Sequence, residues 1–302
     1  MKIKHEIIQN DCLDALPNIA DKSVDLVIAD PPYWKVISEK WDYQWRTEED
    51  YVKWSLKWIE EVSRILRYGG TFYLFGYFRT LAHLIPHLST FELDLRQQIL
   101  VDKGMRAVSG RATKKYRLFP NTTESILFIT KENRTFIKPF LKERQVALGL
   151  SSKEINEALG VKSNGGGMWS IYTGKNVCEQ FPTKKLWEKL QKVLDFELEY
   201  GKVAQTFNPQ MGLTDIWRDI DFYKENRVHP TQKPLKLIKR LIQASSDKGD
   251  LVLDPFGGSG ATAIAALQLE RDFIIIEQDE KYYMDILDRI GQVKNPLANF
   301  TT

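Results

Sequence analysis

A buried strand that runs into a glycine-rich turn and then into a helix is the feature that most constrains this chain. Residues 251–253 are apolar, residues 254–260 read Asp-Pro-Phe-Gly-Gly-Ser-Gly, and residues 261–269 have the pattern of a helix. Because glycine has no Cβ and adopts positive φ easily, the backbone of such a turn can approach a ligand closely. The next apolar strand, 273–276, ends at Glu277, whose carboxylate can accept hydrogen bonds from ribose hydroxyls. The pattern predicts a site for a nucleoside-containing cofactor.

The spacing of the glycines separates the candidate cofactors. A strand, a glycine turn and a ribose-binding carboxylate suit a dinucleotide and S-adenosylmethionine equally well. However, Gly257, Gly258 and Gly260 are bunched, unlike the Gly-x-Gly-x-x-Gly turn of dinucleotide enzymes. Ala261-Thr262 stands where a P-loop needs Lys-Ser or Lys-Thr. The sequence therefore favours S-adenosylmethionine.

Apolar runs of strand length alternate with helical patterns over most of the chain. The expected strands are 3–9, 24–29, 71–75, 98–101, 125–130, 251–253 and 273–276, and the expected helices are 48–66, one through His83 and His87, 236–244 and 261–269. Gly69-Gly70 should stop the helix at 48–66. Strands that alternate with helices predict an α/β fold with a doubly wound, mostly parallel sheet.

Residues 135–223 do not follow this alternation of strands and helices. Ser151-Ser152-Lys153-Glu154 resembles a capping box, a short helix follows it, and Asn164-Gly165-Gly166-Gly167 is typical of a turn. We expect an inserted, mainly helical module, which gives domain boundaries of 1–134, 135–225 and 226–302.

The apolar run 24–29 leads into Asp30-Pro31-Pro32-Tyr33. Taken alone, these four residues could simply end a strand. They also suit methyl transfer to an exocyclic amine, whose lone pair is delocalised into the base and must be localised by hydrogen-bond acceptors. Asp30 and the carbonyl of Pro31 can each accept one amine hydrogen, and the prolines donate no amide hydrogen there. Tyr33 offers a ring on which an extruded base can stack.

Three separated motifs together resemble the beta class of amino-methylating DNA methyltransferases, which act on adenine N6 or cytosine N4. They are the Asp-Pro-Pro-Tyr turn, the glycine turn, and His-Pro-Thr-Gln-Lys-Pro at 229–234, and they occur in the order typical of that class. Asn10-Asp11-Cys12 also looks like the family's segment beside the cofactor's adenine. The resemblance covers 1–130 and 226–290. It implies a Rossmann-like sheet of seven strands, one of them antiparallel, with the insertion as the target-recognition module.

The resemblance implies a site-specific enzyme that flips a base out of DNA and methylates adenine N6 from S-adenosylmethionine. Aspartate at position 30 favours adenine, because relatives that act on cytosine N4 more often carry serine there; cytosine N4 is the first alternative. Methylation of RNA or of a protein amide, and an inactive DNA-binding subunit, are further alternatives. The implied catalytic residues are Asp30, Pro31, Pro32 and Tyr33, and the implied cofactor-binding residues are Asp11, Cys12, Asp30, His229, Lys233, Asp254, Phe256, Gly257, Gly258, Ser259, Gly260 and Glu277.

A basic segment between Asp102 and residue 117 is the candidate for holding DNA phosphates. Its cations are Lys103, Arg106, Arg111, Lys114, Lys115 and Arg117, against the single acid Asp102. A solvated loop without a ligand is the alternative. Because a catalytic turn cannot read a base sequence, we expect the helices at 152–159 and 184–193 of the insertion to recognise the target. Trp41 and Trp45 follow the catalytic turn and are candidates to border the base pocket.

Other features exclude several classes of protein. Cys12 and Cys178 form no Cys-x-x-Cys motif, and His83 and His87 have no third ligand at suitable spacing, so no metal is expected. No run of eighteen apolar residues occurs, and the first residues lack a secretion signal, so we expect a cytoplasmic protein without membrane association. DNA is the expected partner, and the resemblance also allows a cognate restriction endonuclease and a homodimer.

Overall fold

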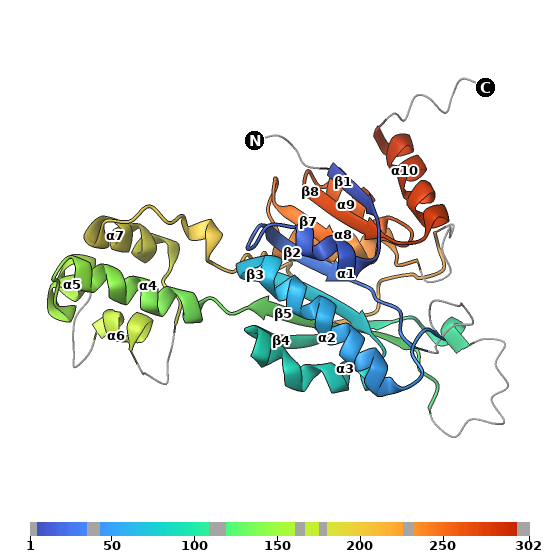
Figure 1. The fold of residues 1–302 in the computed structure, drawn as a ribbon, viewed down its shortest axis with the longest axis horizontal. Coiled ribbons are helices and arrows are strands. Elements are labelled where there is room, and N and C mark those ends of the chain that lie inside the picture. Colours follow the sequence, from blue (N-terminus) through green and yellow to red (C-terminus); the bar gives the residue numbers. More distant parts are fainter. Residues whose placement is uncertain are drawn as a thin grey trace. The chain divides into compact units, whose positions relative to one another are not determined.

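The computed structural model consists of two compact units, which are described separately here. It describes residues 5–34, 43–108, 119–160, 167–174, 180–225 and 232–294. The larger unit comprises residues 1–131 and 206–302, and the smaller unit comprises residues 132–205 (Figure 1). Residues 206–225, which the sequence analysis assigned to the insertion, belong to the larger unit. They do so because Trp217, Ile220 and Phe222 are buried in its core.

The larger unit contains an eight-stranded sheet with the strand order β1-β8-β7-β2-β3-β5-β4-β6. The strands are β1 (His5–Gln9), β2 (Val24–Ala29), β3 (Leu66–Gly76), β4 (Leu93–Asp102), β5 (Thr123–Lys131), β6 (Ile216–Trp217), β7 (Leu251–Asp254) and β8 (Asp272–Glu277). β5 is antiparallel to both of its neighbours, and the other described pairs are parallel. The doubly wound sheet with one reversed strand is therefore confirmed. The eighth strand, β6, has only two residues and lies in the segment that was expected to be inserted.

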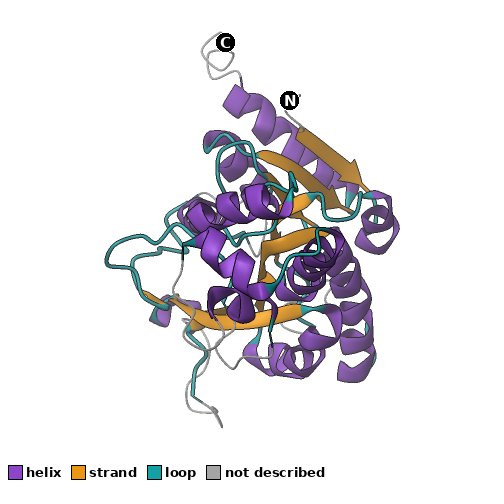
Figure 2. Ribbon diagram, turned by 90° about the vertical axis from the view of Figure 1, so that its left-hand side faces the viewer, coloured by secondary structure: helices purple, strands orange, loops and turns teal. Residues whose placement is uncertain are grey.

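Helices cover both faces of this sheet (Figure 2). They are α1 (Cys12–Ala15), α2 (Glu48–Ile65), α3 (Phe78–Leu84), α8 (Leu235–Ser245), α9 (Ala261–Gln268) and α10 (Glu280–Lys294). One core joins strand residues such as Val27 and Phe72 to α1, α2 and α3. The other joins strand residues such as Ile28 and Tyr73 to α8, α9 and α10. Successive residues of a strand point to opposite faces, which is why β2 and β3 contribute to both cores.

Two local expectations were wrong. Helix α2 ends at Ile65, and Gly69 and Gly70 lie inside β3 instead of stopping the helix. The β2–β3 register moves from Val24 opposite Leu66 to Leu26 opposite Thr71, so the glycines occupy an irregular part of the strand, where Gly69 has φ +72.

The helix expected through both histidines is also interrupted. His83 lies in the last turn of α3, whereas His87 belongs to a 3₁₀ segment, Ile85–Phe91, that starts beside Pro86. Proline has no amide hydrogen and cannot continue the α-helical ladder.

The smaller unit is helical and has its own apolar core. Its helices are α4 (Arg134–Ala147), α5 (Ser152–Leu159), α6 (Gly167–Thr173) and α7 (Lys184–Leu194). The predicted capping box is confirmed: Ser151 accepts from the amide of Glu154, whose carboxylate accepts from the amide of Ser151. Trp169 and Trp187 are fully enclosed in the core of this unit. Buried aromatic rings of this size supply much of the stabilisation that a unit of about seventy residues needs.

Among the described residues of both units, none of the helices is long and apolar enough to cross a lipid bilayer. The cytoplasmic location stays a prediction from the sequence.

Candidate functional site

The carboxyl ends of four parallel strands meet around one cavity of about 890 Å³ in the larger unit. β1 lies beside β8, with Gln9 opposite Glu277, and β2 lies beside β7, with Val27 opposite Leu253. The residues that follow these strands therefore converge, although Gln9 and Glu277 are 268 positions apart in the sequence. This places the Asp-Pro-Pro-Tyr turn after β2 directly beside the glycine turn after β7, and both line the cavity.

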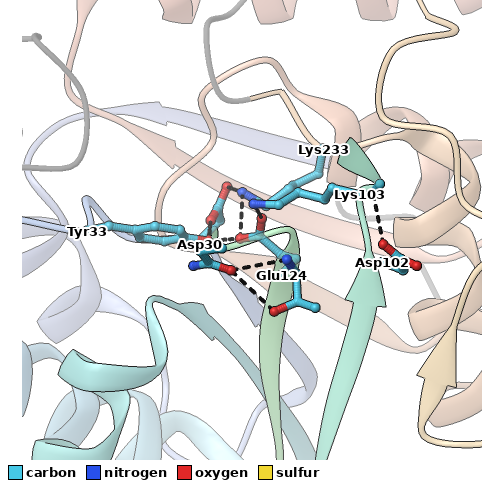
Figure 3. Close-up of polar contacts among 9 residues, drawn as sticks. Asp30, Tyr33, Asp102, Lys103, Glu124 and Lys233 are labelled. Carbon is cyan, nitrogen blue, oxygen red and sulfur yellow. Dashed lines mark hydrogen bonds and ion pairs between the residues drawn. The ribbon is translucent and has the colours of Figure 1, made fainter. Parts of the chain in front are cut away.

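A network of polar and charged side chains links the Asp-Pro-Pro-Tyr turn to two distant parts of the sequence (Figure 3). Lys233 Nζ donates to Asp30 Oδ2 at 2.6 Å and lies 3.7 Å from Glu124 Oε1. Lys103 Nζ donates to Glu124 Oε2 at 3.0 Å. The hydroxyl of Tyr33 lies 2.6 Å from both Asp30 Oδ1 and Glu124 Oε1. Two carboxyl groups, two ammonium groups and one phenol thus form a single cluster.

Burial and the neighbouring charges set the protonation of this cluster. Burial raises the pKa of Asp30, the charge of Glu124 raises it further, and Lys233 only partly opposes them. Burial also acts to raise the pKa of Glu124, but Lys233 and Lys103 together hold it below the ordinary value. Burial disfavours the charged form of Lys233, yet its two carboxylate neighbours keep its pKa raised. Burial and both carboxylates raise the pKa of Tyr33 well above its ordinary value, so the phenol is neutral.

The glycine turn is held by hydrogen bonds to neutral groups. Asp254 ends β7, and its carboxylate accepts from the amide of Phe256 at 2.9 Å and from Thr262 Oγ1 at 2.6 Å. Glu277 ends β8 and accepts from the amide of Gly258 at 2.7 Å and from that of Asp279 at 2.8 Å. Each carboxylate oxygen has a second lone pair, so Glu277 can also receive ribose hydroxyls.

Glycine is required in this turn for two reasons. A Cβ at Gly257 would lie 2.5 Å from Ile275 Cγ2 on the neighbouring strand. Gly260 has φ +71, a conformation that other residues rarely adopt.

A cluster of aromatic rings from α2, the loop before it and the glycine turn borders the cavity, and its extent was not predicted from the sequence. The ring of Phe256 lies 5.9 Å from Trp54 and 5.1 Å from Trp58, and Trp54 lies 4.5 Å from Trp45. Trp45 and Trp54 line the cavity, whereas Trp58 is fully buried behind them. Trp54 was not predicted as a site residue. Trp45 was expected near the base pocket and does border the cavity, whereas Trp41 lies outside the described residues.

Most of the site residues expected from the sequence line this cavity. Those that do are Asp11, Cys12, Asp30, Pro31, Pro32, Tyr33, Lys103, Lys233, Asp254, Phe256, Gly257, Gly258, Ser259 and Glu277. Gly260 ends the glycine turn but does not line the cavity. His229 lies outside the described residues. Asp11 caps α1 by accepting from the amide of Leu13, which places the end of β1 against the cavity.

The expected phosphate-binding residues have different surroundings. Lys103 does not extend outward, because its ammonium group is paired with Glu124, and its side chain is 23% exposed. Arg106 is exposed on a 3₁₀ turn, Met105–Val108. Arg111, Lys114, Lys115 and Arg117 lie outside the described residues.

Glu124 was not predicted from the sequence as a site residue. The residue stands at the second position of β5, opposite Val101 of β4, and in the sequence it looks like an ordinary polar residue at the start of a strand. No motif marks it, and only the pairing of β5 with its neighbours brings it to the cavity.

Comparisons with known proteins agree with this geometry. Residues 24–288 match the family model described as DNA methylase, N6_N4_Mtase. The type II methyltransferase M2.MboI of Moraxella bovis is 24% identical over 293 residues, which cover 91% of this chain and 84% of that protein.

Two solved structures share the fold. The crystal structure of the M1.HpyAVI–SAM complex has a TM-score of 0.57 at 19% identity and covers 95% of this chain and 98% of its own. The cytosine-N4-specific PvuII DNA methyltransferase has a TM-score of 0.58 at 16% identity and covers 98% of this chain and 93% of its own. With an aspartate turn and a glycine turn side by side at one sheet edge, and a family match that spans most of its length, the chain belongs to the N6/N4 DNA methylase family.

Proposed function

We propose that the protein methylates adenine N6 in DNA at a specific sequence and flips the target base into the cavity described above. Methyltransferases of this family use S-adenosylmethionine. The observation that carries the proposal is the placement of Asp30 and the glycine turn at the ends of adjacent strands, where they face one cavity.

The residues around the cavity fit S-adenosylmethionine. When bound, the cofactor supplies an electrophilic methyl group on a sulfonium. Glu277 suits the two ribose hydroxyls, because its carboxylate is held in place by two backbone amides and retains free lone pairs. Phe256, Trp54 and Trp45 offer aromatic faces that suit adenine or a sulfonium cation. Cys12 and Asp11 border the same cavity from the end of β1.

Asp30 is placed to act on the amine. Its side chain is 22% exposed, so part of the carboxylate faces the cavity while Lys233 and Tyr33 hold it from behind. An amine hydrogen donated to this carboxylate localises the nitrogen lone pair, and the fixed partners remove the need to reorganise the site during transfer. The carbonyl of Pro31, at the same turn, accepts the second amine hydrogen in our proposal.

We assign target recognition to the smaller unit and phosphate contacts to the basic segment after β4. The smaller unit carries twelve Lys and Arg residues against nine Asp and Glu, whereas the rest of the chain is balanced, so the net positive charge of the protein lies in this unit. A positive unit attached to a neutral catalytic unit suits a polyanionic substrate. A cognate endonuclease and a homodimer stay predictions.

The decisive experiment offers methyl-labelled S-adenosylmethionine and duplex DNA, RNA or an unrelated protein to the purified chain. Label should enter DNA, and digestion to nucleosides should yield N6-methyl-2′-deoxyadenosine. N4-methylcytosine as the product would keep the family and overturn the choice of base. Label in RNA or protein alone would refute the DNA substrate.

A further inference from the structure

The hydroxyl of Tyr33 makes more close contacts than its one hydrogen can explain. Its oxygen lies 2.6 Å from a carboxylate oxygen of Asp30 and 2.6 Å from one of Glu124. A phenol carries one hydrogen, so it can donate to only one of them. Two oxygen atoms that are 2.6 Å apart with no hydrogen between them repel each other. A second proton therefore belongs on one of the carboxyl groups, which then donates to Tyr33.

The surrounding charges decide which carboxyl holds this proton. Glu124 is 6% exposed and has two ammonium neighbours, Lys103 at 3.0 Å and Lys233 at 3.7 Å. Asp30 has one, Lys233 at 2.6 Å, and it faces the negative charge of Glu124 across the phenol. Glu124 is accordingly the more acidic of the two. The arrangement is Asp30 carboxyl to Tyr33 oxygen, and Tyr33 hydroxyl to Glu124 carboxylate.

We propose that Asp30 and Glu124 share one proton through the Tyr33 hydroxyl, and that Glu124 is a positioning residue that controls when Asp30 is free to receive the amine. This inference rests on the proposed function for its role in the reaction, but the sharing of the proton does not. Asp30 must be ionised when the amine donates to it, so the shared proton has to leave before methyl transfer.

The same pair accounts for the proton that the amine must lose. As the nitrogen–carbon bond forms and the sulfur–carbon bond breaks, the positive charge passes from sulfur to nitrogen. The nitrogen then releases one N–H proton to Asp30, which restores the neutral methylamino group. The protonated Asp30 then donates to Tyr33, which donates to Glu124, and this is the arrangement inferred above from the two 2.6 Å contacts. After product release, water removes the proton from Asp30, so all the atoms and charges of the reaction are accounted for.

The charged groups that face the pair come from five elements. Lys233 precedes α8, Lys103 follows β4, Glu124 is on β5, and Tyr33 belongs to the turn after β2. Asp254 at the end of β7 is close enough for the charge of Asp30 to raise its pKa. Of these, Glu124 adds negative charge near Asp30 and is linked to it through a hydroxyl, whereas burial raises the pKa of Asp254 to about 7 and favours its neutral form.

The direct test is a ¹³C NMR titration of the aspartate and glutamate carboxyls in the cofactor-free protein, with the Asp30 signal assigned by its loss in Asp30→Asn. In Glu124→Gln the midpoint of Asp30 should fall by about 1–2 pH units, because a negative neighbour has been removed. Tyr33→Phe keeps the ring but removes the hydroxyl that bridges the two carboxyls, so Glu124→Gln should lower the midpoint of Asp30 by less in the Tyr33→Phe background than in the wild type. The exposed pair on α2 supplies the matched control, Glu49→Gln, which should leave that midpoint unchanged.

Activity provides the second readout. The acidic limb of kcat against pH should move to lower pH in Glu124→Gln by the same amount as the NMR midpoint. An Asp30 midpoint that stays in place in folded Glu124→Gln, or that falls by the same amount in the Tyr33→Phe background as in the wild type, overturns the inference. A wild-type protein that methylates no DNA but shows the expected NMR shifts would refute the proposed function and leave the shared proton standing.

Discussion

The protein has two Asp-Pro turns at the ends of adjacent parallel strands, and they are held in opposite ways. Asp30-Pro31 follows β2, and Asp254-Pro255 follows β7. Burial is the first cause of a raised pKa at both aspartates. Asp30 is nevertheless bound by the ammonium group of Lys233, which is distant in the sequence, and by the phenol of Tyr33 in its own turn, whereas Asp254 is bound by an amide and a hydroxyl two and eight residues further along the chain.

We propose that the difference separates a reacting group from a structural one. Neutral donors from the same turn fix the shape of the backbone around Asp254, which is 5% exposed and has both oxygens engaged. Charged partners from distant segments keep Asp30 responsive to protons while leaving part of it open to the cavity. Substitutions at the first turn should therefore change catalysis and its pH dependence, and substitutions at the second should change stability.

The largest effect is expected at the reacting carboxylate. Asp30→Ala should lower kcat by about a hundredfold or more, because it removes a preorganised acceptor for the amine. Binding of S-adenosylmethionine, measured by calorimetry, should persist, since Glu277 and the glycine turn are untouched. Turnover close to that of the wild type would show that Asp30 is not the acceptor and would erase the contrast between the two turns.

A smaller effect is expected when the ammonium that supports Asp30 is removed. Lys233→Met leaves two buried carboxyls without their shared cation, so the pKa of Asp30 should rise further. Near pH 7 the rate should fall about tenfold, which corresponds to roughly one unit of pKa, and it should recover partly at higher pH. A uniform loss at every pH would mean that Lys233 acts through another contact. This shift is opposite in sign to the one expected for Glu124→Gln, and the two variants together form a matched pair.

The same contrast explains what could be predicted from the sequence. The turn around Asp254 is local, so the spacing of its aspartate, its glycines and Glu277 could be recognised in the sequence. The parallel strands place this turn beside Asp30, as expected. The role of Glu124 could not be predicted from the sequence, because its position at the cavity depends on the register between β4 and β5. In the sequence it is one polar residue in a strand. Lys103 was assigned to DNA for its charge alone, whereas its position beside Glu124 turns that charge toward the cavity.

Helix and strand ends also depended on context. Gly69-Gly70 has the sequence of a helix stop, but the chain had already left the helix at Ile65 and used the glycines within β3. Pairing with β2 and β5 outweighed the local preference of two glycines. The seven strands expected became eight because a two-residue pairing such as β6 carries no periodic pattern.

The smallest expected effect is the pH dependence of stability at the second turn. Burial raises the pKa of Asp254 to about 7, against an ordinary value of 3.8. The neutral form is thus favoured in the folded protein, and the stabilisation from this proton is complete below the ordinary pKa and is lost as pH rises through about 7. Between pH 6 and pH 8 the cofactor-free wild type should lose about 1 kcal/mol of unfolding free energy that Asp254→Asn does not lose. Urea denaturation of both proteins at the two pH values measures the difference. An equal loss in both proteins would show that Asp254 is ionised throughout, and the two turns would then differ in their partners but not in their protonation.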